Sequence, residues 1–305
     1  MSSTLDAQQT ANRLPWPELV DEIARLLEDD SVRVAPRLVQ ALPGGGSLFV
    51  MPALDSRLAI TKLITFTPAN AGTDRPTIQG DVVVFDVVSG TRVLVLDGPT
   101  VTARRTAAVS ALAAQRLAPN TQGPLLIVGA GVQGKAHMEA FAAVLNVRKV
   151  VIASRSAASA QALVQHAHTL GLAACVVADA NIALADCPLA VSCTPANAIV
   201  LSALPRNDAF ISAVGAFTPA MVELGPDMCR YFAAQGRVFV DTPDALHEAG
   251  DLLQASLNVG DFLTLTDVVR KGIKNTAGPV LFKSCGWAGW DLAAARVAVG
   301  VSAPQ

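Results

Sequence analysis

The spacing of apolar residues changes character along this chain of 305 residues. Over roughly the first hundred, a helical spacing at residues 19–27 is followed by extended apolar runs that predict strands. The Pro-Gly-Gly-Gly run at 43–46 and the Ser-Gly pair at 89–90 predict turns between them. Strands that follow one another without helices favour a largely antiparallel or mixed sheet. We expect these strands over 37–42, 47–51, 57–65, 79–86 and 92–96.

Beyond residue 124, short β-branched runs alternate with helical segments, which is typical of βαβ units around a parallel sheet. Before this region lies an alanine-rich helical stretch over 101–117. The segment Pro-Asn-Thr-Gln-Gly-Pro at 119–124 ends it, as at a domain junction. A last helix is expected over 284–300, and its pattern does not assign it to the parallel sheet. Strands are expected over 125–128, 149–153, 173–177, 189–192, 209–214 and 238–240, and helices over 132–145 and 156–170.

Composition narrows the class of protein. Apolar residues make up 51% of the chain and charged residues 16%, with a formal net charge of −2, which excludes a disordered chain and the basic surface of a nucleic-acid binder. The apolar runs are shorter than the ~20 residues of a membrane span, and no secretory signal is visible. The five cysteines are irregularly spaced, as in reduced proteins. We therefore expect a soluble cytoplasmic protein of about two domains, without nucleic-acid or membrane partners.

A glycine-rich turn is the strongest local indication of a ligand. Gly129, Gly131 and Gly134 follow a predicted strand and open a predicted helix, which is the context of a dinucleotide-binding turn. The first glycine permits the tight turn, the second lets the backbone approach a pyrophosphate, and the third lets the helix pack on the strand. The unpaired N–H groups at the helix start then bind the anion. Val132 and Gln133 lie inside this turn and are candidate cofactor-binding residues with it.

The end of the next predicted strand indicates which dinucleotide is bound. Enzymes that select NAD usually place an Asp or Glu about 20 residues after the turn, whereas this chain has Ser154 and Arg155 there. A guanidinium complements a 2′-phosphate, so we predict NADPH as the preferred cofactor, with NADH possible. The alternative is an arginine that only faces solvent. Thr194, beside Cys193 at another predicted strand end, is expected to line the same pocket.

Cations in apolar surroundings mark the first half of the chain: Arg37, Lys62 and the pair Arg104-Arg105. Lys62 is either a charged residue that protects a sheet edge or a partly desolvated amine whose pKa falls. Arg105 stands near the start of a predicted helix, where a cation opposes the helix dipole. A negatively charged ligand, such as a carboxylate or a phosphate, would compensate it.

Several motifs in this order resemble the ornithine cyclodeaminase/mu-crystallin family over about residues 15–300. The resemblance implies an α/β fold, in which a Rossmann-type parallel-sheet nucleotide domain (121–279) is inserted into an α+β substrate-binding and dimerisation domain (1–120 plus 280–305). It also implies a homodimer. The motifs are Thr-Lys-Leu at 61–63, Asp-Gly-Pro-Thr-Val-Thr-Ala-Arg-Arg-Thr-Ala-Ala at 97–108, Val-Gly-Ala-Gly-Val-Gln at 128–133, Val-Gly-Ala-Phe-Thr-Pro at 214–219, Glu-Ala-Gly-Asp at 248–251 and Phe-Lys-Ser-Cys-Gly at 282–286.

The resemblance also implies roles for individual residues. Arg37 and Arg105 resemble the arginines that hold the substrate α-carboxylate, and Lys62 resembles the lysine that contacts the reacting centre and acts in proton transfer. Thr106 resembles a residue near the cofactor phosphates. Phe217 stands where the family's cyclodeaminases carry an aspartate that interacts with the substrate amine, and a phenyl ring cannot pair with an ammonium group. The string that contains it resembles the bacterial reductases of cyclic imino acids.

The expected activity is therefore NAD(P)H-dependent reduction of cyclic ketimine 2-carboxylates, from Δ1-pyrroline-2-carboxylate to L-proline and from Δ1-piperideine-2-carboxylate to L-pipecolate. An ornithine or lysine cyclodeaminase, an alanine dehydrogenase-like enzyme and a non-enzymatic nucleotide-dependent binding protein stay open as alternatives. No metal site is expected, because His166 and His168 are two positions apart on a predicted helix and face different directions. His137, on the helix after the glycine-rich turn, is expected to be structural or near the cofactor.

Overall fold

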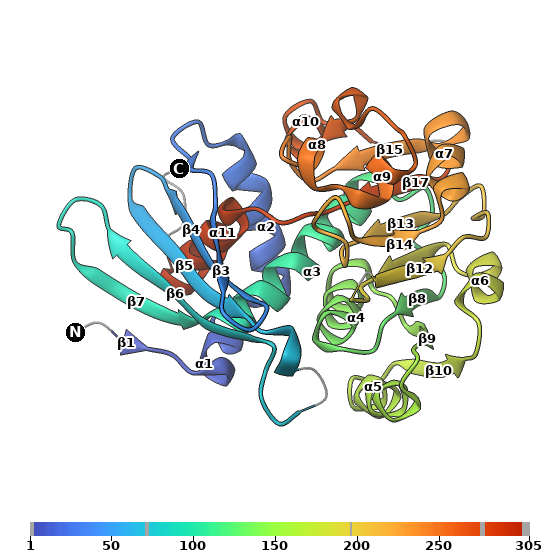
Figure 1. Ribbon diagram of the computed structural model, residues 1–305, viewed down its shortest axis with the longest axis horizontal. Coiled ribbons are helices and arrows are strands. Elements are labelled where there is room, and N and C mark those ends of the chain that lie inside the picture. The colour runs from blue at the N-terminus through green and yellow to red at the C-terminus, as the bar shows by residue number, and fades with distance from the viewer. Residues whose placement is uncertain (1–2, 71–72, 196, 275–277, 301–305) are drawn as a thin grey trace. The chain divides into compact units, whose positions relative to one another are not determined.

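The computed structural model describes residues 3–70, 73–195, 197–274 and 278–300 and is drawn in Figure 1. It divides into two compact units. Unit 1 consists of Met1–Arg105 together with Trp287–Gln305, and unit 2 of Thr106–Gly286. The division falls inside one helix, α3 (Gly98–Leu117). The expected domains, 1–120 plus 280–305 for the substrate and 121–279 for the nucleotide, are defined by what they bind and stay a prediction.

Unit 1 is built on a seven-stranded sheet in which every pair is antiparallel except β1 with β7. This confirms the expectation of a largely antiparallel sheet. The strand order is β1-β7-β6-β5-β4-β2, and β3 also pairs with β4. The strands are β1 (Ser3–Thr4), β2 (Arg33–Val34), β3 (Leu38–Leu42), β4 (Gly46–Leu54), β5 (Leu58–Phe66), β6 (Ile78–Asp86) and β7 (Arg92–Asp97).

Two helices from opposite ends of the chain pack together in unit 1. The first is α2 (Trp16–Glu28), whose apolar residues recur at helical spacing and are buried. The second, α11 (Ala288–Val299), contacts α2, β4 and β5. A buried guanidinium, that of Arg296, joins them: Nε donates to Asp55 (2.6 Å) and a terminal nitrogen donates to Glu22 (3.2 Å). A third helix, α1 (Ala7–Asn12), precedes α2.

Unit 2 contains an eight-stranded parallel sheet in the order β10-β9-β8-β11-β13-β17-β15-β16. The alternation of strands and helices expected from the sequence is confirmed, and so is the α/β fold class. The strands are β8 (Leu125–Val128), β9 (Lys149–Ala153), β10 (Ala173–Val177), β11 (Leu189–Ser192), β13 (Phe210–Ala213), β15 (Arg237–Val240), β16 (Leu263–Thr264) and β17 (Val280–Lys283). The helices are α4 (Val132–Leu145), α5 (Ala157–Thr169), α6 (Ala180–Ala183), α7 (Pro226–Gln235), α8 (Ala245–Glu248), α9 (Gly250–Gln254) and α10 (Leu265–Arg270).

The structure differs from the expected elements at several places. Strand β17 lies between β13 and β15 and was not expected, nor was the small sheet of β12 (Asn197–Leu201) and β14 (Val222–Leu224). Helix α11 begins at Ala288 rather than at 284, because the N–H groups of Cys285 and Gly286 donate to the buried carboxylate of Asp241. Helix α3 begins three residues before 101, since Asp97 accepts from the N–H of Thr100 and caps it.

Candidate functional site

A buried cluster of charged side chains lies in unit 1. Lys62 stands in the middle of β5, with its side chain only 1% exposed. Its neighbours two positions away, Ile60 and Ile64, share its side of the strand and are also buried. The Nζ atom is 2.9 Å and 3.1 Å from the two carboxylate oxygens of Asp291, which lies in the first turn of α11. Strand β5 and helix α11 thus place an ammonium group against a carboxylate away from water.

A second buried cation shares that carboxylate. Arg105 on α3 brings its Nε to 3.3 Å from Asp291, whereas its neighbour Arg104 donates to the carbonyl of Leu14 and lies over the ring of Trp16. One negative charge therefore faces the positive charges of both Lys62 and Arg105. Burying a charge without full compensation is costly, so this cluster favours an additional anion.

The electrostatics of the cluster also tune the amine. Burial lowers the pKa of Lys62 to about 8, the carboxylate of Asp291 opposes this effect, and the charges of Arg105 and Arg37 add to it. Arg37 lies just before β3 and is half-buried. Such an amine is mostly protonated at neutral pH, yet it gives up its proton more readily than an ordinary lysine. It can hold a carboxylate and also supply a proton.

The structure thus gathers Arg37, Lys62 and Arg105, the three cations singled out from the sequence, within reach of one another's charge. Asp291 was missed. Its signal in the sequence was a single acidic residue in the first turn of a helix that is otherwise apolar apart from Arg296. Such a residue is buried only if it has a partner.

The glycine-rich turn of unit 2 has the geometry of an anion-binding turn. Gly129 has a φ of +110°, which favours glycine, and a Cβ on Gly134 would lie 2.0 Å from the carbonyl oxygen of Gly129. A Cβ on Gly131 would instead point into open space. The next residues, Val132 and Gln133, begin α4; the Val132 side chain is 70% exposed, and the buried Oε1 of Gln133 has no hydrogen-bond partner among the described residues.

The other candidate cofactor residues of unit 2 follow neighbouring strands. Strand β8 lies between β9 and β11, so Ser154 and Arg155 flank the glycine-rich turn on one side and Thr194 flanks it on the other. The Arg155 side chain is exposed, and Ser154 accepts a hydrogen bond from the N–H of Ser156. The hydroxyl of Thr194 donates to Glu223 (2.9 Å). Thr106 lies on α3 and is buried. Ser154, Arg155 and Thr194 thus lie beside the glycine-rich turn, as the sequence predicted. Thr106 also belongs to unit 2 but lies on α3.

His137 belongs to a chain of buried hydrogen bonds behind the turn. Its Nδ1 lies 2.8 Å from the carbonyl oxygen of Gln133, which can only accept, so Nδ1 carries the proton. Its Nε2 therefore accepts from the hydroxyl of Ser110 (3.0 Å), and that oxygen accepts from Ser212 (2.9 Å). Burial lowers the pKa of His137 to about 4. The imidazole is neutral at physiological pH and ties the first turn of α4 to α3 and β13.

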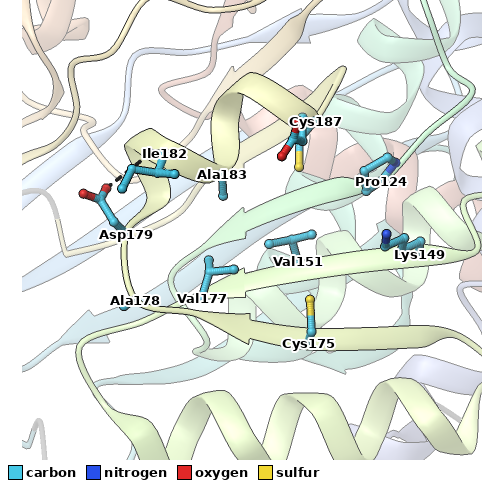
Figure 2. Close-up of a pocket in the computed structure, with 11 residues that line it drawn as sticks. Pro124, Lys149, Val151, Cys175, Val177, Ala178, Asp179, Ile182, Ala183 and Cys187 are labelled. Atoms are coloured by element: carbon cyan, nitrogen blue, oxygen red, sulfur yellow. Dashed lines mark hydrogen bonds between the residues drawn. The ribbon is translucent and has the colours of Figure 1, made fainter.

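A pocket of about 450 Å³ in unit 2 is lined mainly by apolar side chains and by Cys175 and Cys187. Figure 2 shows the sulfur atoms of Cys175 on β10 and of Cys187 directed toward Val151 from opposite sides. Burial, aided by the charges of Asp186 and Cys175, raises the pKa of Cys187 to about 11. The Cys187 thiol therefore stays protonated at neutral pH and is a poor nucleophile.

Two further findings concern only the described ranges. None of their helices combines the length and the apolar character that a membrane span requires. Nor do they contain a group of three or more His, Cys, Asp or Glu side chains placed to hold a metal ion.

Comparison with known proteins gives a consistent family. Residues 16–300 match the ornithine cyclodeaminase/mu-crystallin family, which confirms the resemblance. Delta(1)-pyrroline-2-carboxylate reductase 1 of Burkholderia multivorans is 39% identical over 96% of this chain and 94% of its own. The Delta(1)-pyrroline-2-carboxylate/Delta(1)-piperideine-2-carboxylate reductase of Azospirillum brasilense is 36% identical over the same shares.

A solved structure shares the fold. The Delta(1)-pyrroline-2-carboxylate reductase of Thermococcus litoralis, in complex with NADH and L-proline, superposes with a TM-score of 0.89. The match covers 97% of this chain and 96% of that one, at 22% identity. This likeness supports the fold class.

The buried imidazole of His137 makes the stability of the fold depend on pH. The group binds its proton near pH 6.5 when unfolded but only near pH 4 when folded. Between these values the unfolded chain holds more protons. The free energy of unfolding therefore falls as the pH is lowered, by about 1 kcal/mol per pH unit for this group.

Urea denaturation of His137→Gln between pH 7 and pH 4 measures this dependence. We expect the variant to lose that part of the slope, whereas His168→Gln, a change at an exposed position of α5, keeps the wild-type slope. Equal slopes in the wild type and His137→Gln would contradict the assignment.

Proposed function

The chain belongs to the ornithine cyclodeaminase/mu-crystallin family, and from this premise we propose that it is an NAD(P)H-dependent reductase of cyclic ketimine 2-carboxylates. It would reduce Δ1-pyrroline-2-carboxylate to L-proline and Δ1-piperideine-2-carboxylate to L-pipecolate. Relatives at 36–39% identity over nearly the whole chain carry these activities in their names. The observation in the structure that carries the proposal is the buried cluster of Lys62, Arg105 and Asp291.

The residues of unit 2 fit a nicotinamide dinucleotide. The open space at Gly131 is where a backbone can approach a pyrophosphate. The unpartnered Oε1 of Gln133 in the same turn is an acceptor that suits a hydroxyl of the cofactor. We therefore propose that Gly129, Gly131, Val132, Gln133 and Gly134 bind the dinucleotide, whose phosphates would accept from the backbone N–H groups of the turn. We also assign Ser154, Arg155, Thr194 and Thr106 to the dinucleotide site. When bound, the reduced nicotinamide supplies the hydride.

The cations of unit 1 perform the other half of the task. A guanidinium fork suits a carboxylate, so we assign Arg37 and Arg105 to the carboxylate of the imino acid. A substrate anion there would also compensate the positive charge of the cluster. Lys62, with its pKa of about 8, keeps a proton available for the imine nitrogen, and a protonated C=N carbon accepts hydride more readily. Asp291 is a positioning residue, since its two carboxylate oxygens fix the Nζ of Lys62 and the Nε of Arg105.

Cyclodeamination is the alternative that the sequence disfavours most. It needs a group that pairs with a substrate ammonium, and Phe217 stands at that position. This side chain is partly buried and packs against the apolar core of unit 2, where it serves as an apolar surface. We also propose that the substrate domain comprises 1–120 plus 280–305 and the nucleotide domain 121–279, which the division into two compact units supports.

The proposed activity is tested by following NADPH absorbance with each cyclic imine. We expect Lys62→Ala and Arg105→Ala to lower kcat/KM by at least about a hundredfold, because each removes charge from the reacting centre. Lys271→Ala, at an exposed pair with Asp267, is the matched control and keeps wild-type activity.

Parallel assays separate the alternatives. Oxidation of NADPH only with pyruvate and free ammonia would indicate an alanine dehydrogenase, and ammonia release from ornithine with catalytic NAD would indicate a cyclodeaminase. Dinucleotide binding without any turnover would indicate a binding protein. Each of these results, or full activity of Lys62→Ala, would contradict the proposal.

We propose further that NADPH is preferred over NADH. The support is local: Ser154 and Arg155 directly follow β9, with no carboxylate at the two positions, and the exposed guanidinium is available to a 2′-phosphate. Arg155→Ala should lower kcat/KM for NADPH about tenfold and leave that for NADH within about twofold. Arg148→Ala, exposed at the opposite end of β9, is the control. A wild-type preference for NADH would refute this proposal.

A homodimer is the third element of the proposal. The side of the unit 1 sheet opposite Lys62 exposes large apolar side chains: Leu38, Leu54 and Leu63 are 55%, 44% and 45% exposed. Leu38 and Leu63 face each other across Val50 of β4, and such a patch is typical of an interface. A second copy of this chain would cover it.

Sedimentation velocity measures this state. We expect a wild-type dimer and a shift toward monomer in Leu63→Glu, because a charge would then be buried in the interface. Val88→Glu changes a side chain that is 90% exposed and should remain dimeric. A monomeric wild type would contradict the proposal. A cytoplasmic location is supported by the five free cysteines, and recovery of the protein from the secreted fraction would contradict it.

A further inference from the structure

Glu223 is a buried carboxylate that joins two strand-end loops of unit 2. It lies in β14 and is fully buried. Its Oε1 accepts hydrogen bonds from the hydroxyl of Ser192 (2.7 Å) and from the N–H (2.7 Å) and hydroxyl (2.9 Å) of Thr194. Its Oε2 accepts from the N–H groups of Gly215 (2.6 Å) and Ala216 (3.2 Å). Five donors from the ends of β11 and β13 thus converge on one side chain.

Only an ionised carboxylate satisfies this arrangement. All five partners donate to Glu223. An ionised carboxylate only accepts and has about four lone pairs, so two of the five donors share one lone pair. A glutamine of the same size would offer one oxygen, and its NH₂ group would face donors on the other side. The charge of Glu223 therefore holds the two loops at their present separation.

The two loops pack closely against the carboxylate. A Cβ on Gly215 would lie 2.2 Å from the carbonyl oxygen of Thr194 and 2.5 Å from the Oε1 of Glu223, so the two loops and the carboxylate are in van der Waals contact. A shift of the carboxylate would move both loops together.

A second carboxylate fixes the backbone of Glu223. Asp251 accepts from the N–H groups of Glu223 (2.6 Å) and Leu224 (2.9 Å), and its other oxygen lies 3.0 Å from the Nζ of Lys283 at the end of β17. Burial opposes the charge of Lys283, yet the carboxylate of Asp251 keeps the pKa of this lysine above its ordinary value. Helix α9, through Asp251, and strand β17, through Lys283, therefore help to set the position of the Glu223 backbone.

The place of these loops in the sheet gives them a function. The strand order reverses between β8 and β11, and ligands of such sheets bind beyond the carboxyl ends of the strands at the reversal. By this rule the turn after β8 would hold the pyrophosphate of a dinucleotide, and the end of β9 would hold its adenosine ribose. The nicotinamide half then extends toward the ends of β11 and β13, which are the loops that Glu223 holds.

We propose that Glu223 is a positioning residue that fixes the loops after β11 and β13 as the nicotinamide end of the dinucleotide site. The inference rests on the proposed dinucleotide-dependent reduction. The Glu223 carboxylate is bonded to the ends of β11 and β13 and not to the turn after β8, so its loss should affect the orientation of the nicotinamide, and hence kcat, far more than the binding of the adenosine half. A displacement of about 1 Å can cost about a hundredfold in rate.

The test is Glu223→Gln, compared with Glu139→Gln, which makes the same change at a partly buried carboxylate of unit 2 that pairs with His166. Two probes are titrated into each protein: NADPH, and ADP-ribose, which lacks the nicotinamide. We expect Glu223→Gln to bind ADP-ribose within about twofold of the wild type but to lose at least about tenfold in kcat. Glu139→Gln should keep the wild-type kcat even where it lowers the melting temperature.

Other outcomes overturn the inference. An unchanged kcat in Glu223→Gln would do so, and so would an equal loss of ADP-ribose and NADPH binding, which would show a general loss of structure. If Glu223→Gln does not fold, Ser192→Ala removes one donor to the same carboxylate and should lower kcat about two- to fivefold without changing ADP-ribose binding. An unchanged kcat there refutes the proposal. If the wild type binds both probes but reduces no cyclic imine, the proposed function fails instead.

Discussion

The ammonium of Lys62 and the guanidinium of Arg105 are both removed from water, and they share the single carboxylate of Asp291. Charges buried in this way are tolerated only when partners compensate them, so Asp291 must lie where β5 and α3 can both reach it. Helix α11 carries it there from the far end of the chain, and Arg296 on the same helix is paired with Glu22 and Asp55. The cluster thus depends on a helix that buried ion pairs hold on the sheet.

The cluster is at the same time incomplete. Two cations facing one carboxylate give this part of unit 1 an excess of positive charge. Burial lowers the pKa of Lys62 to about 8, and the positive charges of Arg105 and Arg37 add to this effect. An anionic substrate would restore the balance and raise the proton affinity of the same amine. Binding of the acid group and readiness for proton transfer are therefore two consequences of one electrostatic arrangement.

In unit 2 the buried charges are negative, and they hold loops in place. The loops after its strands have backbone N–H groups that buried carboxylates accept from. Glu223 accepts from the loops after β11 and β13, and Asp241 accepts from the loop after β17. Each carboxylate fixes a loop without any regular secondary structure. The glycine-rich turn after β8 differs, because a Cβ on Gly131 would meet nothing within 4 Å and its backbone is open to close approach by an anion. Rigid loops around one open turn suit a cofactor that must be held in a single orientation.

Much of this could be predicted from local patterns. Strand β8 and helix α4 have the expected bounds of 125–128 and 132–145, because a glycine-rich turn between a strand and a helix is a local signal. The charges of Lys62 and Arg105 stood out from their apolar neighbours. Their partner Asp291 did not, because it lies 229 residues after Lys62 and no local pattern pairs such distant positions. Glu223 was missed for the same reason, since its donors come from two other strand ends.

The most direct measurement of the central claim is calorimetric titration of the NADP⁺-loaded protein with L-proline and, separately, with pyrrolidine, which is the same ring without its acid group. If the excess positive charge around Lys62 and Arg105 holds the carboxylate, L-proline will bind at least about a hundredfold more tightly than pyrrolidine, and Lys62→Met will abolish most of that difference. Equal affinities for the two rings would contradict the account.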